Sequence, residues 1–396
     1  MILNGLLTKL IKKGHLVWID HAGNELNYGD KSGECIKIKT SIPISGIKLI
    51  LSPEIYIGEL YMDGQLKVVD ASIFDLLKLV FSNMTSENSH WILKLSRNIS
   101  KMKSKYIQNN FIIKSKKNVA HHYDLSDRLY DLFLDEDRQY SCAYFKSTND
   151  SLAKAQKNKK ELIGKKLILS KDDKVLDIGS GWGGMAQYLA EKYKAKVKGI
   201  TLSEEQIRYS NRRKKNNNLK NVKFKLQDYR NEVGSYDRIV SVGMFEHVGT
   251  PYYLEFFKKV YQLLNERGIA LIHTIGRVDG PSVPDPWINK YIFPGGYIPS
   301  LSEIMINVEN SGLVTNDIQV LKYHYAETLK RWRYNFYDNI EEIKEIYDDR
   351  FCRMWDFYLS SSQASFDSAN LVVFQLQLSK NKNTVPDKRD YLFKNS

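Results

Sequence analysis

Residues 174–184 constrain the fold of this chain more than any other stretch. An apolar segment at 175–178 is typical of a short buried strand, and a helical pattern of apolar residues begins at Met185. Four glycines lie between them, at Gly179, Gly181, Gly183 and Gly184. A strand, a glycine turn and a helix N-terminus bring backbone N–H groups close to a ligand, because glycine has no Cβ to block the approach. The stretch predicts a ligand-binding turn, although an ordinary tight turn shows the same pattern.

The end of the next predicted strand narrows the choice of ligand. Nicotinamide sites usually place an acidic residue about 20 residues further on, at that strand end. Here the strand at 196–200 runs into Thr201, Leu202 and Ser203, with no carboxylate at its tip. The pattern at 174–184 instead resembles the first motif of S-adenosylmethionine-dependent methyltransferases. In those enzymes the glycine turn faces the amino-acid part of the cofactor, so we expect S-adenosylmethionine here.

Strand and helix patterns alternate through the second half of the chain. Predicted strands occupy 175–178, 197–200, 222–226, 238–242 and 269–275, with helical patterns between them and a clear helix at 253–264. This alternation predicts a parallel, doubly wound α/β sheet with right-handed crossovers, to which a late strand at 372–378 is added last. The stretch 276–301, rich in glycine, proline and aromatic residues, is too long for a routine loop and predicts a lid or substrate wall.

The first 95 residues predict a separate small α+β domain. Strands are expected at 17–20, 35–40 and 47–51, and helices at 55–61 and 73–81. No pair of catalytic side chains stands out, so we expect a lipid-docking or dimerisation role. Residues 96–122 form a basic linker without Asp or Glu, which is either solvated or contacts an anionic bilayer. Residues 123–396 are then the catalytic domain.

Composition limits the partners and the location. The net charge of +13 favours nucleic acid or an anionic membrane as partner, although a lysine-rich genome bias accounts for part of it. A second basic run at 208–225 is expected to be a solvated helix face. No apolar run reaches the roughly 20 residues that span a bilayer. Residues 1–14 are too rich in lysine for a secretory signal, so we expect a cytoplasmic protein. Cys35, Cys142 and Cys352 are too widely spaced for a disulfide framework or a metal site.

Polar and ionisable residues follow the predicted strands at the edge where ligands of open α/β sheets bind. Together they indicate a functional site rather than a plain sheet edge. They are Thr201, Gln206, Asp228, Tyr229, Glu246, His247, His273 and Thr274.

Seven motifs occur in a fixed order, at 121–126, 140–145, 176–184, 199–206, 245–249, 273–276 and 291–300. Together they resemble the cyclopropane-fatty-acyl-phospholipid synthase family, which includes the mycolic acid cyclopropane synthases. The resemblance covers residues 121–379, and residues 58–64 resemble the accessory domain of the phospholipid-acting members. It implies a Rossmann-like methyltransferase sheet of seven strands with a small N-terminal α+β accessory domain.

The resemblance also implies a reaction. A methyl group of S-adenosylmethionine is added across a cis double bond of a membrane lipid acyl chain, and loss of a proton from the resulting carbocation closes the ring. Aromatic faces stabilise such a cation. Candidates for that role are Tyr144, Phe145, Tyr291, Phe293, Tyr297, Trp332 and Tyr337. In the family the base is thought to be a bound bicarbonate.

Site residues carry over from the family motif by motif. The bicarbonate holders would be Cys142, Glu246, His273, the backbone of Ile275, and Tyr325. Residues around the cofactor would be Tyr140, Ser141, Gly179, Gly181, Gly183, Thr201, Leu202, Gln206, Asp228 and Tyr229. A carboxylate suits an anion site only if Glu246 shares a proton with the anion or is neutral. No metal ligand is expected.

One segment departs from the family pattern. Many members carry a cysteine at the end of the segment corresponding to 358–362, where this chain has Ser362. A covalent cysteine mechanism through that position is therefore excluded, whereas the bicarbonate-type site is unaffected.

Several functional alternatives remain open. The same cofactor and lipid substrate would also allow a methyl-branched or methylene product. A small-molecule methyltransferase fits the aromatic-rich stretch and the extra domain less well. An RNA methyltransferase rests on charge alone, because recognition of RNA needs bases stacked on exposed aromatic residues. We expect unsaturated phospholipids as substrate, peripheral association with the anionic inner face of the membrane, no nucleic acid, and a homodimer through the N-terminal domain.

Overall fold

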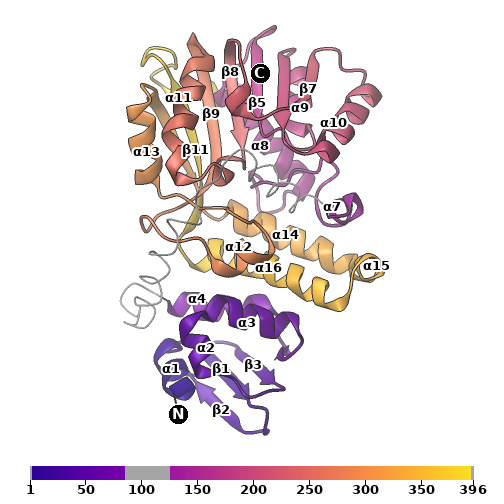
Figure 1. The fold of residues 1–396 in the computed structure, drawn as a ribbon, viewed down its shortest axis with the longest axis vertical. Coiled ribbons are helices and arrows are strands. Elements are labelled where there is room, and N and C mark those ends of the chain that lie inside the picture. The colour runs from indigo at the N-terminus through magenta and orange to yellow at the C-terminus, as the bar shows by residue number, and fades with distance from the viewer. Residues whose placement is uncertain (1, 85–124, 394–396) are drawn as a thin grey trace. The chain divides into compact units, whose positions relative to one another are not determined.

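The structure is a computed structural model that describes residues 2–84 and 125–393 (Figure 1). Contacts divide the chain into two compact units. The first unit takes residues 1–106, 283–294 and 326–370, and the second takes 107–282, 295–325 and 371–396. The predicted linker at 96–122 and most of the motif at 121–126 lie outside the described residues. The limits that the sequence predicts for the accessory domain (1–95), the linker (96–122) and the catalytic domain (123–396) remain a prediction.

The first unit contains a four-stranded sheet in the order β2-β1-β3-β4. Its strands are β1 (His15–Ile19), β2 (Glu25–Tyr28), β3 (Cys35–Thr40) and β4 (Leu66–Val69). β1 and β3 are parallel, and the other two pairs are antiparallel. Four helices accompany the sheet: α1 (Ile2–Leu10), α2 (Gly46–Leu51), α3 (Pro53–Met62) and α4 (Ile73–Asn83).

The strand predicted at 47–51 is wrong, because this stretch is helix α2. Ser45 caps the helix, and its side chain accepts a hydrogen bond from the Lys48 N–H at 3.3 Å. Only Leu49 of the helix is fully buried. A short apolar run does not by itself distinguish a buried strand from one helical turn, and here the serine cap decides for the helix.

Later parts of the chain complete the first unit. They form α12 (Pro286–Tyr291), α14 (His324–Asp338) from residue 326 onwards, α15 (Ile340–Ile346) and α16 (Asp349–Ser368). α16 packs against α3 and α4, and α12 packs against α3. A Cβ at Gly58 would lie 2.3 Å from Trp287 Nε1, so only glycine permits the close approach of α3 to α12.

A buried hydrogen bond joins α3 to α16, and its loss has a predictable cost. The Tyr61 hydroxyl donates to Asp356 Oδ2 at 2.6 Å. Tyr61→Phe should therefore lower the free energy of unfolding by about 2 kcal/mol, because a buried carboxylate loses a donor. Tyr28→Phe is the matched control, since the buried Tyr28 hydroxyl has no hydrogen-bond partner among the described residues. Urea denaturation of both variants measures the difference, and equal costs would contradict the prediction.

The second unit contains a seven-stranded sheet in the order β10-β11-β9-β8-β5-β6-β7. The strands are β5 (Lys174–Ile178), β6 (Lys196–Thr201), β7 (Val222–Leu226), β8 (Tyr236–Val242), β9 (Leu264–Arg277), β10 (Val314–Leu321) and β11 (Leu371–Ser379). The Rossmann-like α/β class and all six predicted strands are confirmed, and β10 was missed.

One detail of the predicted sheet is wrong. The sheet is mixed rather than parallel, because β11 runs antiparallel to both β9 and β10. β11 is the last strand of the sheet in chain order, as expected, and it lies between β9 and β10. The sequence does not predict β10, because Thr315, Asn316 and Asp317 interrupt its apolar pattern. In the structure, its pairing with β11 is irregular between Thr315 and Asp317.

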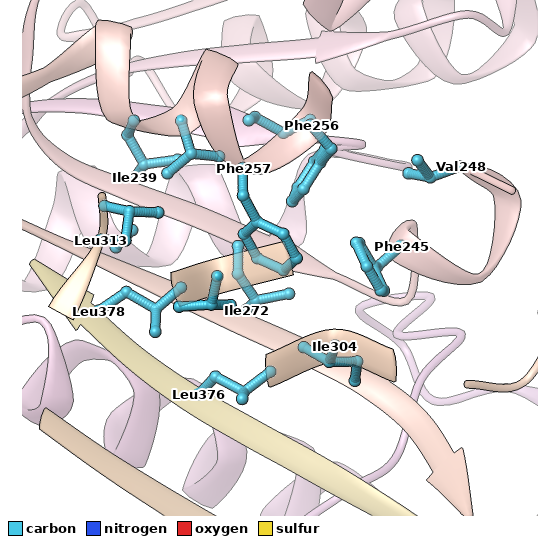
Figure 2. Close-up of a cluster of buried hydrophobic side chains, with 14 of the residues drawn as sticks. Ile239, Phe245, Val248, Phe256, Phe257, Ile272, Ile304, Leu313, Leu376 and Leu378 are labelled. Atoms are coloured by element: carbon cyan, nitrogen blue, oxygen red, sulfur yellow. The ribbon is translucent and has the colours of Figure 1, made fainter. Parts of the chain in front are cut away.

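Helices cover both faces of this sheet (Figure 1). They are α7 (Asp127–Phe133), α8 (Leu152–Lys166), α9 (Gly184–Lys192), α10 (Glu204–Asn216), α11 (Tyr253–Leu263) and α13 (Leu301–Asn310). Side chains of α11 and α13 form one apolar core with alternate strand residues, which Figure 2 shows around Phe257 and Ile272. Side chains of α8 and α9 form a second core on the other face.

The strands alternate strictly between these two faces. Leu176 and Ile178 of β5 belong to the core under α11 and α13, whereas Val175 belongs to the core under α8 and α9. Because side chains of a strand alternate, Asp177 points to the same face as Val175. Among the described residues, no helix has the length and apolar content required to cross a membrane.

Candidate functional site

The glycine turn joins β5 to α9 at the centre of the second sheet. Gly179, Gly181 and Gly183 have φ values of +79°, +53° and +81°, which favour glycine over residues with a Cβ. The N–H groups of Gly179 and Ser180 both donate to Ile200 O at 2.9 Å, and this ties the turn to β6. Gly183 is the N-cap residue of α9.

A cavity opens at the carboxyl ends of β5, β6, β7 and β8. Nine of the ten predicted cofactor residues line it. They are Tyr140, Ser141, Gly179, Gly181, Thr201, Leu202, Gln206, Asp228 and Tyr229. Gly183 is not among the lining residues, because it already begins the helix. His247, expected among the polar residues that follow the strands, also lines the cavity, whereas sequence reasoning missed other lining residues, including Arg138, Gln139, Asp177, Trp182 and Met244.

Two hydrogen-bonded pairs shape the polar side of the cavity. The Thr201 hydroxyl donates to Gln206 Oε1 at 2.6 Å, so the Gln206 amide NH2 remains as a donor group. Asp228 accepts two hydrogen bonds from the Arg230 guanidinium, at 2.9 and 2.8 Å. The uncharged Gln206 amide is therefore a donor near the end of β6. At the end of β7, the Arg230 guanidinium balances the charge of the Asp228 carboxylate.

Asp177 is a cavity residue that sequence reasoning missed, although its place two residues before Gly179 in the strand–turn motif is a signal for it. Its side chain is buried, and Oδ2 has no hydrogen-bond partner among the described residues. Burial raises the pKa of Asp177 to about 7, against which the charge of Lys159 acts in the opposite direction. A carboxylate held this way is poised between its charged and neutral forms near neutral pH.

The raised pKa of Asp177 makes stability depend on pH. In the folded state the carboxyl retains its proton up to about pH 7, whereas the unfolded chain releases it near the ordinary pKa of 3.8. The folded state then binds more protons, so the contribution to stability falls as the pH rises between these values. Asp177→Asn should therefore raise the free energy of unfolding by about 2 kcal/mol more at pH 8 than at pH 5.5. Urea denaturation at both pH values tests this, and an equal effect at both would contradict it.

Glu246 and Ile275, two of the predicted catalytic residues, are in direct contact. The Ile275 N–H donates to Glu246 Oε1 at 2.6 Å, and Glu246 Oε2 is buried without a hydrogen-bond partner among the described residues. Burial raises the pKa of Glu246, while the Ile275 amide and the Thr274 hydroxyl act to lower it. Glu246 lies in the 3-10 turn Phe245–His247, between the cavity residues Met244 and His247.

His273 is a buried, neutral histidine on β9. Burial, aided by the charges of Lys159 and Lys166, lowers the pKa of His273 to about 3. Gln375 Nε2 lies 3.1 Å from His273 Nδ1. If the amide donates there, the ring proton is on Nε2, and this tautomer is assigned from the hydrogen bond. The His273 carbonyl accepts from the N–H of the cavity residue Gly243 at 2.9 Å.

Cys142 and Tyr325 lie on other parts of the second unit. Cys142 is fully buried, and its thiol donates to Ala143 O at 3.3 Å. Tyr325 is buried next to His324, whose Nδ1 accepts from the Phe145 N–H at 3.2 Å. The segment that carries Cys142 and Phe145 is therefore bonded to the residue before Tyr325.

The aromatic candidates are divided between the two units. Tyr144, Phe145 and Tyr297 belong to the second unit, in which Tyr144 and Phe145 both lie against the His324 ring. The other four, Tyr291, Phe293, Trp332 and Tyr337, belong to the first unit.

Comparison with known proteins identifies close similarities. Residues 112–376 match the family model of mycolic acid cyclopropane synthetase. The cyclopropane-fatty-acyl-phospholipid synthase of Escherichia coli K12 is 41% identical over 259 residues, which cover 65% of this chain and 66% of that protein. Tuberculostearic acid methyltransferase UfaA1 of Mycobacterium tuberculosis is 32% identical over 336 residues, which cover 81% of this chain and 78% of that protein.

Solved structures agree with these matches. The cyclopropane synthase MmaA2 of Mycobacterium tuberculosis superposes with a TM-score of 0.64 at 30% identity, covering 67% of this chain and 98% of that one. The mycolic acid cyclopropane synthase CmaA1, in complex with SAH and CTAB, has a TM-score of 0.63 at 32% identity, covering 66% of this chain and 97% of that one.

Proposed function

Because the chain belongs to the mycolic acid cyclopropane synthetase family and is an S-adenosylmethionine-dependent methyltransferase, we propose that it makes cyclopropane rings in phospholipids. The substrate is a cis double bond in a phospholipid acyl chain. The observation that carries the proposal is that Glu246 and His273 are both buried near the cofactor cavity. Glu246 precedes the cavity residue His247 in the chain, and the His273 carbonyl accepts from the N–H of the cavity residue Gly243. Burial raises the pKa of Glu246 and lowers that of His273 to about 3, and such poorly hydrated surroundings suit a reaction that passes through a carbocation.

The cavity residues fit the cofactor by their chemistry. S-adenosylmethionine, when bound, supplies an electrophilic methyl group. The glycine turn leaves room for close backbone approach at Gly179 and Gly181, and the Gln206 amide and Asp228 offer a donor and an acceptor for the polar groups of the cofactor. Ser141 and Tyr140 also line the cavity.

The predicted bicarbonate holders also fit a small protonated anion. Glu246 Oε2 is a buried acceptor without a partner among the described residues, and His273 would have a donor in Nε2–H in the tautomer assigned above. Bicarbonate carries both an O–H group and acceptor oxygens, so it complements these two groups by chemistry, and it would supply a base for the proton lost on ring closure. The Ile275 N–H already donates to Glu246, so Ile275 would support the anion through that carboxyl group.

A second product class has its own support. UfaA1, described as a tuberculostearic acid methyltransferase, matches more of this chain than the Escherichia coli synthase does, 81% against 65%. A methyl-branched or methylene acyl chain is therefore the alternative product of the same cofactor and lipid substrate.

Mass spectrometry of acyl chains tests the proposal. Purified protein is incubated with S-adenosylmethionine and liposomes of cis-unsaturated phosphatidylglycerol and phosphatidylethanolamine. A gain of one CH2 with loss of the reducible double bond supports cyclopropanation. A gain of one CH2 with the double bond retained supports the methylene alternative, and a reduced, branched chain supports the methyl-branched one. Unchanged lipid in the presence of bound cofactor contradicts the proposed substrate.

We further propose that the enzyme works at an anionic membrane surface. The net charge of +13 supports this, because each lysine or arginine near an anionic surface contributes roughly 1 kcal/mol. Co-sedimentation with phosphatidylglycerol liposomes, compared with RNA under the same salt, distinguishes this from the nucleic-acid alternative. Selective retention by RNA would overturn it.

A further inference from the structure

Helix α8 buries polar side chains on the face that it turns towards the cavity wall. Gln156 and Lys159 lie three residues apart, on the same side of the helix, and both have an exposed fraction of 0%. Among the described residues, no carboxylate lies within 4 Å of the Lys159 ammonium, so it forms no ion pair. The sequence alone does not distinguish these two residues, because the lysine-rich pattern of α8 is typical of an exposed basic helix.

Four hydrogen bonds connect these two side chains to one short segment. Gln156 Nε2 donates to Gln139 O at 3.1 Å and to Ser141 O at 2.9 Å. Lys159 Nζ donates to Gln139 Oε1 at 2.7 Å and to Ser141 Oγ at 2.8 Å. Both the backbone and the side chains of Gln139 and Ser141 are therefore held from α8.

The segment that they hold is the wall of the cofactor cavity. Gln139, Tyr140 and Ser141 all line the cavity, and Cys142 follows directly. The segment is not part of a helix or strand, so no regular backbone ladder fixes its conformation. The side chains of Gln156 and Lys159 on α8 fix its conformation instead.

The charge of Lys159 is not needed to pack the helix. Burying an ammonium without a carboxylate partner is unfavourable, and a methionine or leucine would fill the same space without this cost. Burial accordingly lowers the pKa of Lys159 to about 8, and the charge of Asp135 acts in the opposite direction. A costly buried ammonium that donates its hydrogen bonds to the cavity wall is better explained by the site than by stability.

We propose that Gln156 and Lys159 are positioning residues that hold the wall Gln139–Tyr140–Ser141 in the shape that binds S-adenosylmethionine. The inference rests on the cofactor assignment, but not on the lipid substrate or the product. The competing explanation is that the two side chains only attach α8 to the rest of the unit.

Calorimetric titration of the full chain with S-adenosylhomocysteine separates the two explanations. The variant Lys159→Met removes the ammonium but keeps the volume, and Gln156→Met removes the two donors to the backbone. We expect each variant to weaken S-adenosylhomocysteine binding about tenfold. Asn158→Leu is the matched control, because Asn158 is buried on the same helix but donates to Asp150 Oδ2 at 2.9 Å, away from the wall. It should lower the melting temperature similarly and change the affinity less than twofold.

A double-variant cycle tests whether Lys159 acts through Ser141. In the Ser141→Ala background, Lys159→Met should weaken binding by no more than about threefold, because its partner hydroxyl is already gone. Affinities of Lys159→Met and Gln156→Met within twofold of the wild type, with melting temperatures as low as that of Asn158→Leu, would overturn the proposal. If Lys159→Met does not fold, Gln156→Met and Lys159→Gln decide by the same criterion. Wild-type protein that binds S-adenosylhomocysteine but leaves lipid unchanged would refute only the proposed substrate.

Discussion

Glu246→Ala is expected to lower product formation at least a hundredfold while leaving the affinity for S-adenosylhomocysteine within about twofold. Positioned acid–base groups typically contribute about 10²–10⁴ to a rate, and Glu246 is proposed to hold the group that accepts the proton. Its carboxyl group is not among the residues that line the cofactor cavity, so cofactor binding should survive. Single-turnover kinetics with unsaturated liposomes, together with calorimetry, measure both quantities.

Two further variants make this experiment sharper. Glu246→Gln keeps an acceptor and the side-chain volume, so it should retain more activity than Glu246→Ala. Asp173→Asn is the control for removal of a partly buried carboxylate, because Asp173 lies before β5, at the opposite end of that strand from the cavity. It should turn over normally. Full turnover by Glu246→Ala would remove Glu246 from the mechanism.

Gly179→Ala is expected to destabilise the unliganded protein by about 3 kcal/mol. A Cβ at Gly179 would lie 2.7 Å from Met244 Cβ and Cγ, so the turn or the segment that follows β8 has to move. The φ of +79° adds the cost of a left-handed conformation, about 1–2 kcal/mol. Urea denaturation without cofactor measures the loss.

Gly181→Ala is the matched control in the same turn. Its φ is +53°, but a Cβ there would meet no atom within 4 Å. We expect this variant to lose only the conformational term, about 1–2 kcal/mol. If both variants lost the same free energy, the contact with Met244 would not be the cause.

The central part of the second unit was predictable because local patterns and global packing agree there. The strand at 175–178, the glycines and the helix that follows are each recognisable from spacing alone, and the structure places them at the centre of the sheet. Nine of the ten expected cofactor residues then meet at one cavity, since strand ends in such a sheet share an edge.

Other features depend on tertiary context that the sequence does not carry. The lysine-rich pattern of α8 is typical of a solvated helix, yet Lys159 and Lys166 are buried. The Lys159 ammonium donates to Gln139 and Ser141, and that of Lys166 lies 4.0 Å from Asp317 Oδ2. The raised pKa of Asp177 follows from burial, which no local pattern reveals. The grouping of 283–294 and 326–370 with the N-terminal sheet depends on contacts between residues far apart in the chain.

The position of β11 has a consequence for how the chain is made. The chain leaves the sheet at Arg277 and returns only at Leu371, to fill the gap between β9 and β10. During synthesis, one edge of β9 therefore stays unpaired until residue 379 has emerged from the ribosome. An unpaired strand edge can form hydrogen bonds with other chains, which promotes aggregation. Nascent chains stalled before residue 371 should thus bind chaperones and aggregate, whereas chains extended past residue 379 should resist protease.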